Sequence, residues 1–183
     1  MGTSTEIERK FLLEDDSWVN QVTEMSEIEQ HYLLSTPTSN VRVRMKQKGD
    51  KTSYLHTIKE KSPLHEGSKE IENEISEDTF SGLKQISIGS IFKTRYIIPA
   101  GDYKWEIDVF SGNLEGLVMA EIEIPSFDTK IELPSFIGKE VTNDKRYSNA
   151  NLCMDCNIED DPEKVLENAD KDDNSTKECL KKL

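Results

Sequence analysis

Charged side chains recur at every second position in several stretches of this sequence, and each stretch carries mainly one sign of charge. The acidic positions are Glu6, Glu8, Glu70, Glu72, Glu74, Glu106, Asp108, Glu121 and Glu123. The basic positions are Lys10, Arg42, Arg44, Lys46, Lys59, Lys61, Lys93 and Arg95. Grouped carboxylates bind hard cations such as Mg²⁺ or Mn²⁺, whereas arginine and lysine bind phosphate oxygens. The two groups together indicate a site for a polyanion and a divalent cation.

A simpler interpretation exists for any one of these stretches. Charges at alternate positions are typical of a solvated strand face, where they deter edge-to-edge aggregation. The repetition in stretch after stretch argues against it, because like charges in adjacent positions cost stability and a surface would be expected to mix the two signs. Convergence on one ligand accounts for the grouping better. Phosphoryl transfer needs mainly positioning and charge neutralisation, which such side chains and a metal can supply.

Apolar residues fill the positions between the charges, as in Val41, Val43 and Met45 between the arginines. A period of two predicts β-strands with one charged and one apolar face. We expect strands over residues 5–13, 31–34, 41–47, 53–61, 69–75, 92–99, 103–110 and 118–124. Turn residues at 49–50 and 100–102 predict hairpins between neighbouring strands.

The sequence predicts few helices, all of them short. They are a helix after Asp15 and Asp16 with Trp18, Val22 and Met25 at helical spacing, a helix capped by Ser76 that carries Phe80, Leu83 and Ile86, and a helical turn over residues 134–138. The expected fold class is α+β: a closed antiparallel eight-stranded β-barrel, or tunnel. Its interior would be charged, and its apolar outer face would be covered by the helices.

The composition agrees with a charged interior, since only 34% of the 183 residues are hydrophobic and 32% are charged. A net charge of −13 argues against a nucleic-acid partner. No apolar run approaches the length of a membrane span, and we expect a cytoplasmic protein with no membrane partner. Residues 1–157 are expected to form one domain, and residues 158–183 an acidic, disordered tail.

Other common sites find little support in the sequence. Cys153 and Cys156 form a C-x-x-C pair, but no second pair of cysteines or histidines accompanies them, which argues against zinc. We interpret both as ordinary thiols. A glycine-rich phosphate loop and a Ser-His-Asp triad are also not recognisable, so any phosphates must be held by side chains.

The motif E-x-E-x-K formed by Glu6, Glu8 and Lys10 resembles the N-terminal motif of the CYTH superfamily, also known as triphosphate tunnel metalloenzymes. The similarity continues in order along residues 6–152. It includes residues 32–33, 41–44, 57–59, Glu72, Glu74, 93–96, 105–108, 117–123 and 140–149. The chain is most similar to the short bacterial branch that is associated with inorganic triphosphatase activity.

The resemblance implies roles for individual residues. Metal ligands would be Glu6, Glu8, Glu121 and Glu123, with Glu72, Glu74 and Asp108 as further contributors. Phosphate would be bound by Lys10, Arg42, Arg44, Lys59, Lys93, Arg95 and Arg146. Lys10 and Tyr32 would be catalytic, with Tyr32 orienting or deprotonating the attacking water, although Tyr32 could equally be an aromatic residue that packs on a neighbouring strand. The implied cofactor is Mg²⁺ or Mn²⁺, which would activate the water.

The function that follows is metal-dependent hydrolysis of inorganic triphosphate to pyrophosphate and phosphate, with nucleoside triphosphates as further candidate substrates. Within the superfamily, a class IV-type adenylate cyclase and a thiamine triphosphatase are alternatives. A polyphosphate sensor without catalytic activity is an alternative of another class, but binding alone would need only the basic residues. The expected partner is the small triphosphate substrate, and a homodimer is left open.

Overall fold

The structure, a computed structural model, describes residues 2–61, 68–126 and 128–153. The strands are β1 (Gly2–Leu13), β2 (Glu24–Ser35), β3 (Ser39–Lys48), β4 (Lys51–Lys61), β5 (Ser68–Glu74), β6 (Gly89–Ala100), β7 (Tyr103–Ser111), β8 (Val118–Ile124) and β9 (Ile137–Glu140). The helices are α1 (Glu77–Lys84) and α2 (Asn149–Leu152), with 3₁₀ turns η1 (Val19–Gln21), η2 (Gly112–Leu114) and η3 (Lys145–Tyr147). The predicted tail, residues 158–183, lies outside the described residues, as does Cys156.

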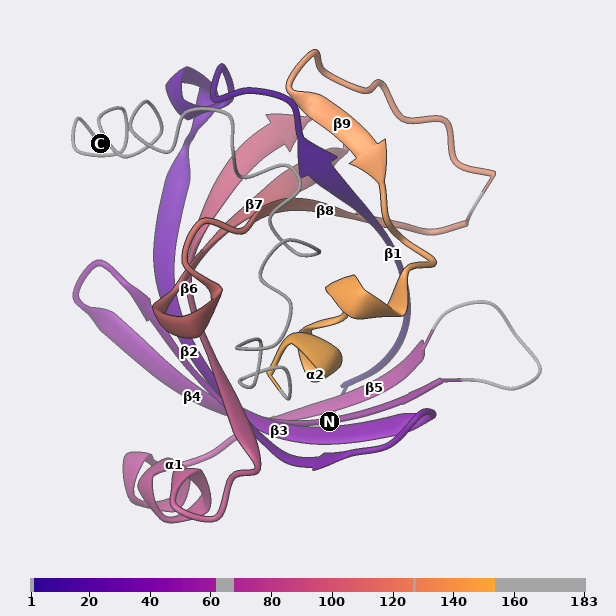
Figure 1. The fold of residues 1–183 in the computed structure, drawn as a ribbon. Coiled ribbons are helices and arrows are strands. Elements are labelled where there is room, and N and C mark those ends of the chain that lie inside the picture. The colour runs from indigo at the N-terminus through magenta and orange to yellow at the C-terminus, as the bar shows by residue number, and fades with distance from the viewer. Residues whose placement is uncertain (1, 62–67, 127, 154–183) are drawn as a thin grey trace.

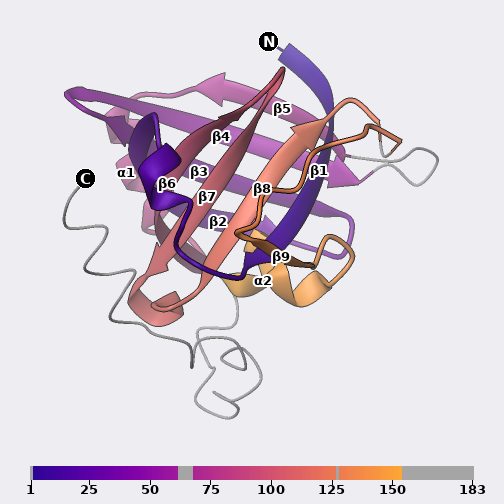
Figure 2. The ribbon, with the colours of Figure 1, turned by 90° about the horizontal axis from the view of Figure 1, so that it is seen from above.

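The strands form one antiparallel sheet in the order β5-β4-β3-β2-β6-β7-β8-β1-β9, which curls so that one of its faces is turned inward (Figure 1). Strand β1 changes partner along its length: residues 2–6 pair with β5, and residues 7–12 pair with β8. Strand β9 pairs with the far end of β1 (Figure 2).

The mostly antiparallel sheet with few helices was predicted, but the closed eight-stranded barrel was wrong in two respects. The sheet has nine strands, because β9 forms where a helical turn over 134–138 was expected. It is also not a closed cylinder. Closure would require the same residues of β1 to pair with both β5 and β8, and in the described strand its pairing to β5 ends where its pairing to β8 begins.

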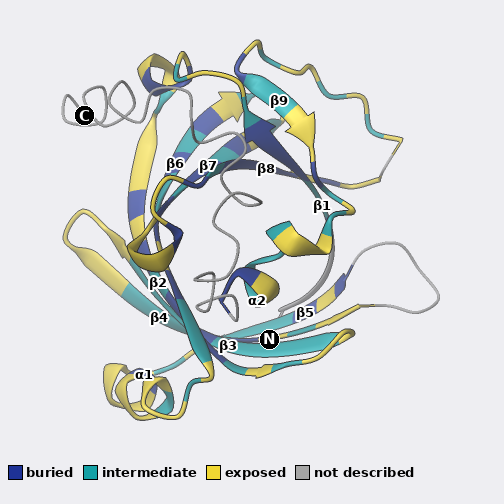
Figure 3. Ribbon diagram, viewed as in Figure 1, coloured by how far each residue is buried: buried dark blue, intermediate teal, exposed yellow. Residues whose placement is uncertain are grey.

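Alternation assigns every strand an inner and an outer face. On the outer face, Phe11, Trp105 and Ile122 belong to a buried apolar core that also includes Trp18 and Phe136 from the covering segments. The rings of Phe11 and Trp105 meet edge to face at 5.5 Å. Figure 3 shows the buried residues along the strands, whereas α1 is largely exposed. The apolar core therefore lies outside the curl, which leaves the inner face to polar groups.

One end of the inner face is apolar. We define the inner apolar cluster as Leu12, Tyr32, Ile91, Phe110, Leu114, Leu117, Met119, Val141, Leu152 and Cys153. Helix α2 contributes Leu152, and Figure 1 shows this helix lying across the space that the strands surround. The cluster therefore occupies one end of the inner face, and the charged residues occupy the remainder.

Local signals account for the short elements that were predicted correctly. The Ser76 hydroxyl accepts a hydrogen bond from the Thr79 amide at 3.1 Å and caps α1, as expected. Gly49 and Gly101 adopt positive φ angles of 56° and 63° in the β3–β4 and β6–β7 hairpins. Within the described residues, no helix is both long and apolar enough to cross a bilayer.

The helix expected over Trp18, Val22 and Met25 was wrong. Only η1 forms there, and Val22 is already extended at φ −65° and ψ 131°. Strand β2 then begins at Glu24, which pairs with Ile97 of β6. The ladder to β6 satisfies more backbone groups than a short helix would, and Trp18 and Val19 still reach the outer core.

Candidate functional site

The charged residues singled out by alternation lie mainly on the inner face, where acidic and basic side chains from neighbouring strands form ion pairs. Lys10 of β1 is at the centre: its Nζ contacts the carboxylate of Glu121 on β8 and lies 3.1 Å from Oε1 of Glu8. Burial alone would lower the pKa of Lys10, but the charges of Glu121 and Glu8 more than offset it and raise this pKa. The ammonium form of Lys10 is therefore favoured in this arrangement.

Arg95 and Lys93 of β6 hold the acidic residues of β7. The Nε and Nη2 atoms of Arg95 each lie 2.6 Å from an oxygen of Asp108, and Nη2 also lies 2.8 Å from Oε2 of Glu121. Lys93 contacts the same Asp108 carboxylate, which is fully buried. With two cations already bound, Asp108 orients the basic residues more readily than it would hold a metal.

Arg42 and Arg44 of β3 face β5 across β4. Arg44 donates to Oε2 of Glu72 at 2.7 Å, and Arg42 lies 3.5 Å from Oε1 of Glu70. The Nε–H groups of both arginines are buried and find no acceptor among the described residues. Burial and the nearby charges of Arg42 and Arg95 lower the pKa of Arg44. Unpaired buried donors in a field of like charge are a site for an anion.

Lys59 of β4 connects these two groups of ion pairs. Its Nζ lies 3.4 Å from Glu70 and 3.9 Å from Oε1 of Glu8. Lys46 also faces this region from β3, and its pKa is lowered by partial burial and by the charges of Arg44 and Arg95. The inner face thus carries cations on β3, β4, β6 and β1, while the intervening strands β2, β7 and β8 place uncharged or acidic residues there.

The predicted metal ligands are brought together in part. Glu8 and Glu123 lie directly opposite each other on β1 and β8, and Lys10 bridges Glu8 to Glu121. Burial raises the pKa of Glu121, but Lys10, Lys93 and Arg95 together hold it well below its ordinary value. Lys10 likewise lowers the pKa of Glu8. Both groups are carboxylates at neutral pH, as metal ligands must be.

The remaining acidic candidates are less close to this group. The side chain of Glu6 lies outside the described atoms, Glu72 is bound to Arg44, and Glu74 is exposed at the end of β5. Among the described residues no three acidic, histidine or cysteine side chains converge as they would around a metal ion. The donor chemistry nevertheless fits a hard cation, because Glu8 and Glu123 are opposed like charges and Glu123 has no ion-pair partner in the described part of the chain.

Tyr32 and Arg146 occupy different environments. Tyr32 is 1% exposed at the border between the charged inner face and the inner apolar cluster, and its hydroxyl accepts a hydrogen bond from Nε2 of Gln30 at 2.6 Å. Arg146 lies in η3, where it pairs with Asp144 at 2.7 Å and its side chain is 61% exposed. Among the ion pairs of residues 2–61, 68–126 and 128–153, Arg146 is joined to Asp144 and not to the acidic residues of the inner face.

Sequence reasoning missed some polar residues of this face. Gln30 is buried beside Tyr32, and the Thr57 hydroxyl donates to Glu72 at 3.0 Å. Neither residue is charged, so the sign pattern could not reveal them. The alternation Ser26, Ile28, Gln30, Tyr32 would have placed Gln30 on the inner face if the strand had been started at residue 24 instead of 31.

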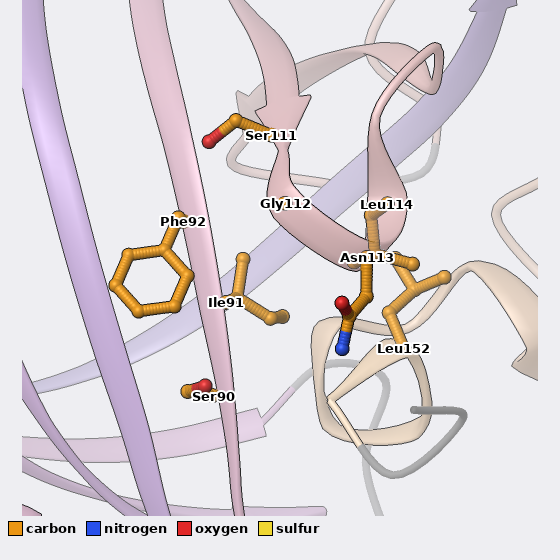
Figure 4. A pocket seen from close by; sticks show the side chains of 8 residues that line it. All are labelled: Ser90, Ile91, Phe92, Ser111, Gly112, Asn113, Leu114 and Leu152. Carbon is orange, nitrogen blue, oxygen red and sulfur yellow. The ribbon is translucent and has the colours of Figure 1, made fainter. Parts of the chain in front are cut away.

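A small cavity of about 90 Å³ lies beside the inner apolar cluster (Figure 4). Ile91, Leu114 and Leu152 line it, together with Phe92 and the residues around Asn113. Its lining carries no charged side chain, so it does not have the chemistry to bind a polyanion. The charged part of the inner face remains the candidate site.

The fold and the charged inner face define a known class, because residues 4–152 match the model of the CYTH domain. The chain belongs to this family.

Two relatives named inorganic triphosphatase are similar over most of the chain. The one from Nitrosomonas europaea is 36% identical and aligns over 82% of this chain and 97% of its own length. The one from Acetivibrio thermocellus is 33% identical, over 80% of this chain and 92% of its own length. The crystal structure of an inorganic triphosphatase superposes with a TM-score of 0.57 at 33% identity, covering 82% of this chain and 95% of that one.

Proposed function

We propose that this protein hydrolyses inorganic triphosphate to pyrophosphate and phosphate with the help of a divalent cation. The observation that carries the proposal is the set of inner-face cations, in which the buried Nε–H groups of Arg42 and Arg44 have no acceptor in the described structure. An extended polyanion would satisfy these donors. The relatives that bear the name inorganic triphosphatase support the same substrate.

The basic residues would neutralise the substrate. Arg42, Arg44 and Arg95 can each present two nitrogens to phosphate oxygens, while Lys10, Lys59 and Lys93 act as point charges. Each of these residues forms an ion pair with a carboxylate of the inner face, which defines its position. Such preorganised charge is the main contribution that proteins make to phosphoryl transfer.

The carboxylates of Glu8, Glu121 and Glu123, together with Glu6, are the candidates to hold Mg²⁺ or Mn²⁺. A bound divalent cation would neutralise phosphate charge and make water a better nucleophile. Lys10 would balance the charge of Glu8 and Glu121 and meet the substrate as an ammonium. The high pKa of Tyr32, about 12, favours orienting the reacting groups over accepting a proton.

The alternatives within the family lack a supporting observation. A cyclase must also orient an adenine and a ribose, and a thiamine triphosphatase must bind a thiamine ring. The cavity lined by Ile91, Leu114 and Leu152 is small, and no charged side chain lines it. A solved structure named as a putative adenylate cyclase, from Bacillus halodurans, is 21% identical with a TM-score of 0.51, which speaks for the fold alone.

Two substitutions test the assignment of the site. Glu8→Gln removes a metal ligand, and Arg44→Ala removes a phosphate donor. We expect each to lower the rate of tripolyphosphate hydrolysis by about 100-fold or more, since one preorganised charged contact is worth that much. Phosphate release under saturating Mg²⁺ measures the effect.

Lys48→Ala is the matched control, because Lys48 ends β3 and pairs with Glu24 in solvent. It should keep the wild-type rate. Circular dichroism and thermal melting show whether each variant folds. If folded Glu8→Gln and Arg44→Ala both retain activity within about threefold of the wild type, the inner face is not the active site.

A further inference from the structure

Gln30 and Tyr32 form a buried polar pair on the inner face of β2. Because they are two residues apart on one strand, their side chains point the same way. The Gln30 carboxamide donates from Nε2 to the Tyr32 hydroxyl at 2.6 Å, and the two residues are only 2% and 1% exposed. Their cross-strand neighbours on β3 are the two arginines with unpaired donors: Gln30 is opposite Arg44, and Tyr32 is opposite Arg42.

The environment keeps the Tyr32 phenol neutral. Burial raises its pKa, the positive charge of Arg42 offsets only part of that effect, and the result is a pKa of about 12. The phenol therefore keeps its hydrogen at neutral pH. A buried neutral phenol in this setting can donate a hydrogen bond far more readily than it can accept a proton.

The direction of that hydrogen follows from the partners of the oxygen. A phenol oxygen accepts hydrogen bonds and carries a single hydrogen to donate. Gln30 supplies a donor to the oxygen, and the guanidinium of Arg42 approaches the same hydroxyl. The hydrogen must point away from both donors. Cys153, which also acts on the phenol, donates its Sγ–H to the Ala150 carbonyl at 3.0 Å, and among the hydrogen bonds of the described residues none is donated by the Tyr32 hydroxyl. A buried donor left over in this way needs a ligand atom.

We infer that Gln30 is a positioning residue that directs the Tyr32 O–H toward a phosphoryl oxygen of the bound triphosphate, so that Tyr32 serves as a hydrogen-bond donor and not as a base. This inference rests on the proposed function for its substrate. Tyr32 adds one neutral donor beside the arginines. Gln30 itself touches no substrate and acts through the phenol.

A double-mutant cycle separates this role from simple packing or charge. Gln30→Glu keeps the size of the side chain but replaces the donor with an acceptor, which turns the phenol hydrogen back toward residue 30. Tyr32→Phe removes the hydrogen altogether. We expect each single variant to lower kcat for tripolyphosphate by about 10- to 100-fold and to weaken tripolyphosphate binding measurably, as for loss of one hydrogen bond to a charged group.

The double variant is the deciding measurement. If Gln30 acts through Tyr32, adding Gln30→Glu to Tyr32→Phe lowers kcat by less than about threefold further. If Gln30→Glu lowers kcat equally with and without the hydroxyl, its added charge is responsible and the inference is wrong. Gln30→Met serves as a second probe, because it removes the donor without adding a charge and should give an intermediate loss only when Tyr32 is present.

Two further measurements test the role of Gln30 and Tyr32 independently of the proposed function. The pH profile of Tyr32→Phe between pH 7 and 10 should keep the wild-type shape; loss of a rising limb would identify Tyr32 as a base and overturn the inference. Calorimetric titration of tripolyphosphate in the presence of chelator needs no turnover. A protein that binds tripolyphosphate in this titration but does not hydrolyse it when Mg²⁺ or Mn²⁺ is supplied would refute the proposed function, and the same cycle in Kd would still show whether Gln30 and Tyr32 are coupled.

Discussion

Lys10 illustrates how single side chains on the inner face are balanced. Its ammonium is enclosed by Glu8 and Glu121, and Arg95 adds a second cation to Glu121. The acidic and basic residues neutralise each other in these ion pairs. A triphosphate and a divalent cation bound together could replace these ion pairs without leaving a charge unbalanced. The triphosphate would bind the basic residues, and the metal would bind the carboxylates.

Replacing Lys10 tests how much its ion pairs with Glu8 and Glu121 contribute to stability. Lys10→Met preserves much of the volume but leaves two carboxylates without their shared partner. We expect the free energy of unfolding to fall by about 2–4 kcal/mol, somewhat below the value for a fully buried pair because about a third of the Glu8 side chain is exposed. Urea denaturation at pH 7.5 measures it.

Lys48→Met provides the comparison for Lys10→Met, because the Lys48–Glu24 pair is in solvent. It should leave the urea midpoint unchanged. Equal midpoints for the two variants would mean that Lys10 does not hold the inner face together.

Residue-level prediction from the sequence succeeded where charge and alternation coincide. Lys10, Arg42, Arg44, Lys93 and Arg95 all lie on the inner face as expected. Their signal is strong because an ordinary solvated strand face mixes the two signs of charge. Uncharged Gln30 carries no such signal, and the exposed position of Arg146 depends on η3, whose short 3₁₀ turn has no periodicity to detect.

At the scale of elements, the C-terminal end of α2 packs closely against the start of β6 at the apolar end of the inner face. A methyl group on Gly89 would lie 2.3 Å from the carbonyl oxygen of Cys153, which is too close for any side chain. The amide of the preceding residue, Ile88, donates to the Tyr32 carbonyl at 2.8 Å. Glycine at position 89 therefore allows the end of α2 to pack against the start of β6, at the position that pairs with Tyr32 of β2.

Gly89→Ala should consequently displace α2, because the clash is with backbone and cannot be relieved by a rotamer change. We expect a loss of about 1–3 kcal/mol in the free energy of unfolding, typical of overpacking. Thermal melting gives the measurement.

Gly82→Ala is the matched substitution, since Gly82 lies in α1 with open space around its Cα. It should raise stability by about 0.5–1 kcal/mol through helix propensity. A Gly89→Ala protein that melts no lower than the wild type would mean that α2 is not held against β6.

Elements were predictable where one periodicity dominated. Strands β3, β4, β7 and β8 alternate clearly, and Ser76 marks the start of α1. The region 18–25 failed because its apolar residues fit a helical spacing, while tertiary pairing with β6 decided the outcome. The short strand β9 depends on an edge of β1 that no local signal could reveal.

At the scale of the whole molecule, the carboxylates of the inner face link stability to pH. The pKa of Glu121 is held well below the ordinary value of 4.5 because three cations outweigh the effect of burial, and the pKa of Glu8 is lowered chiefly by Lys10. A group whose pKa is lower in the folded state binds protons more readily when unfolded. Its stabilising contribution is present above pH 4.5 and is lost as pH falls through the folded pKa.

We therefore expect the melting temperature to be nearly constant from about pH 8 to about pH 5.5 and to fall steeply below about pH 4.5. Scanning calorimetry in buffers of equal ionic strength checks this. In Glu121→Gln the acid-side slope should be shallower, because one of the depressed carboxyl groups is gone. An identical slope in wild type and Glu121→Gln would show that Glu121 does not contribute to the linkage.

The turnover of triphosphates by the purified full-length chain tests the proposed activity itself. Tripolyphosphate, ATP and thiamine triphosphate are supplied in turn with Mg²⁺, Mn²⁺ or chelator, and phosphate, pyrophosphate and cyclic AMP are quantified. We predict equal amounts of phosphate and pyrophosphate from tripolyphosphate, dependent on metal and abolished by chelator. Absence of turnover of tripolyphosphate with either metal would contradict the assignment of this protein as a metal-dependent triphosphatase.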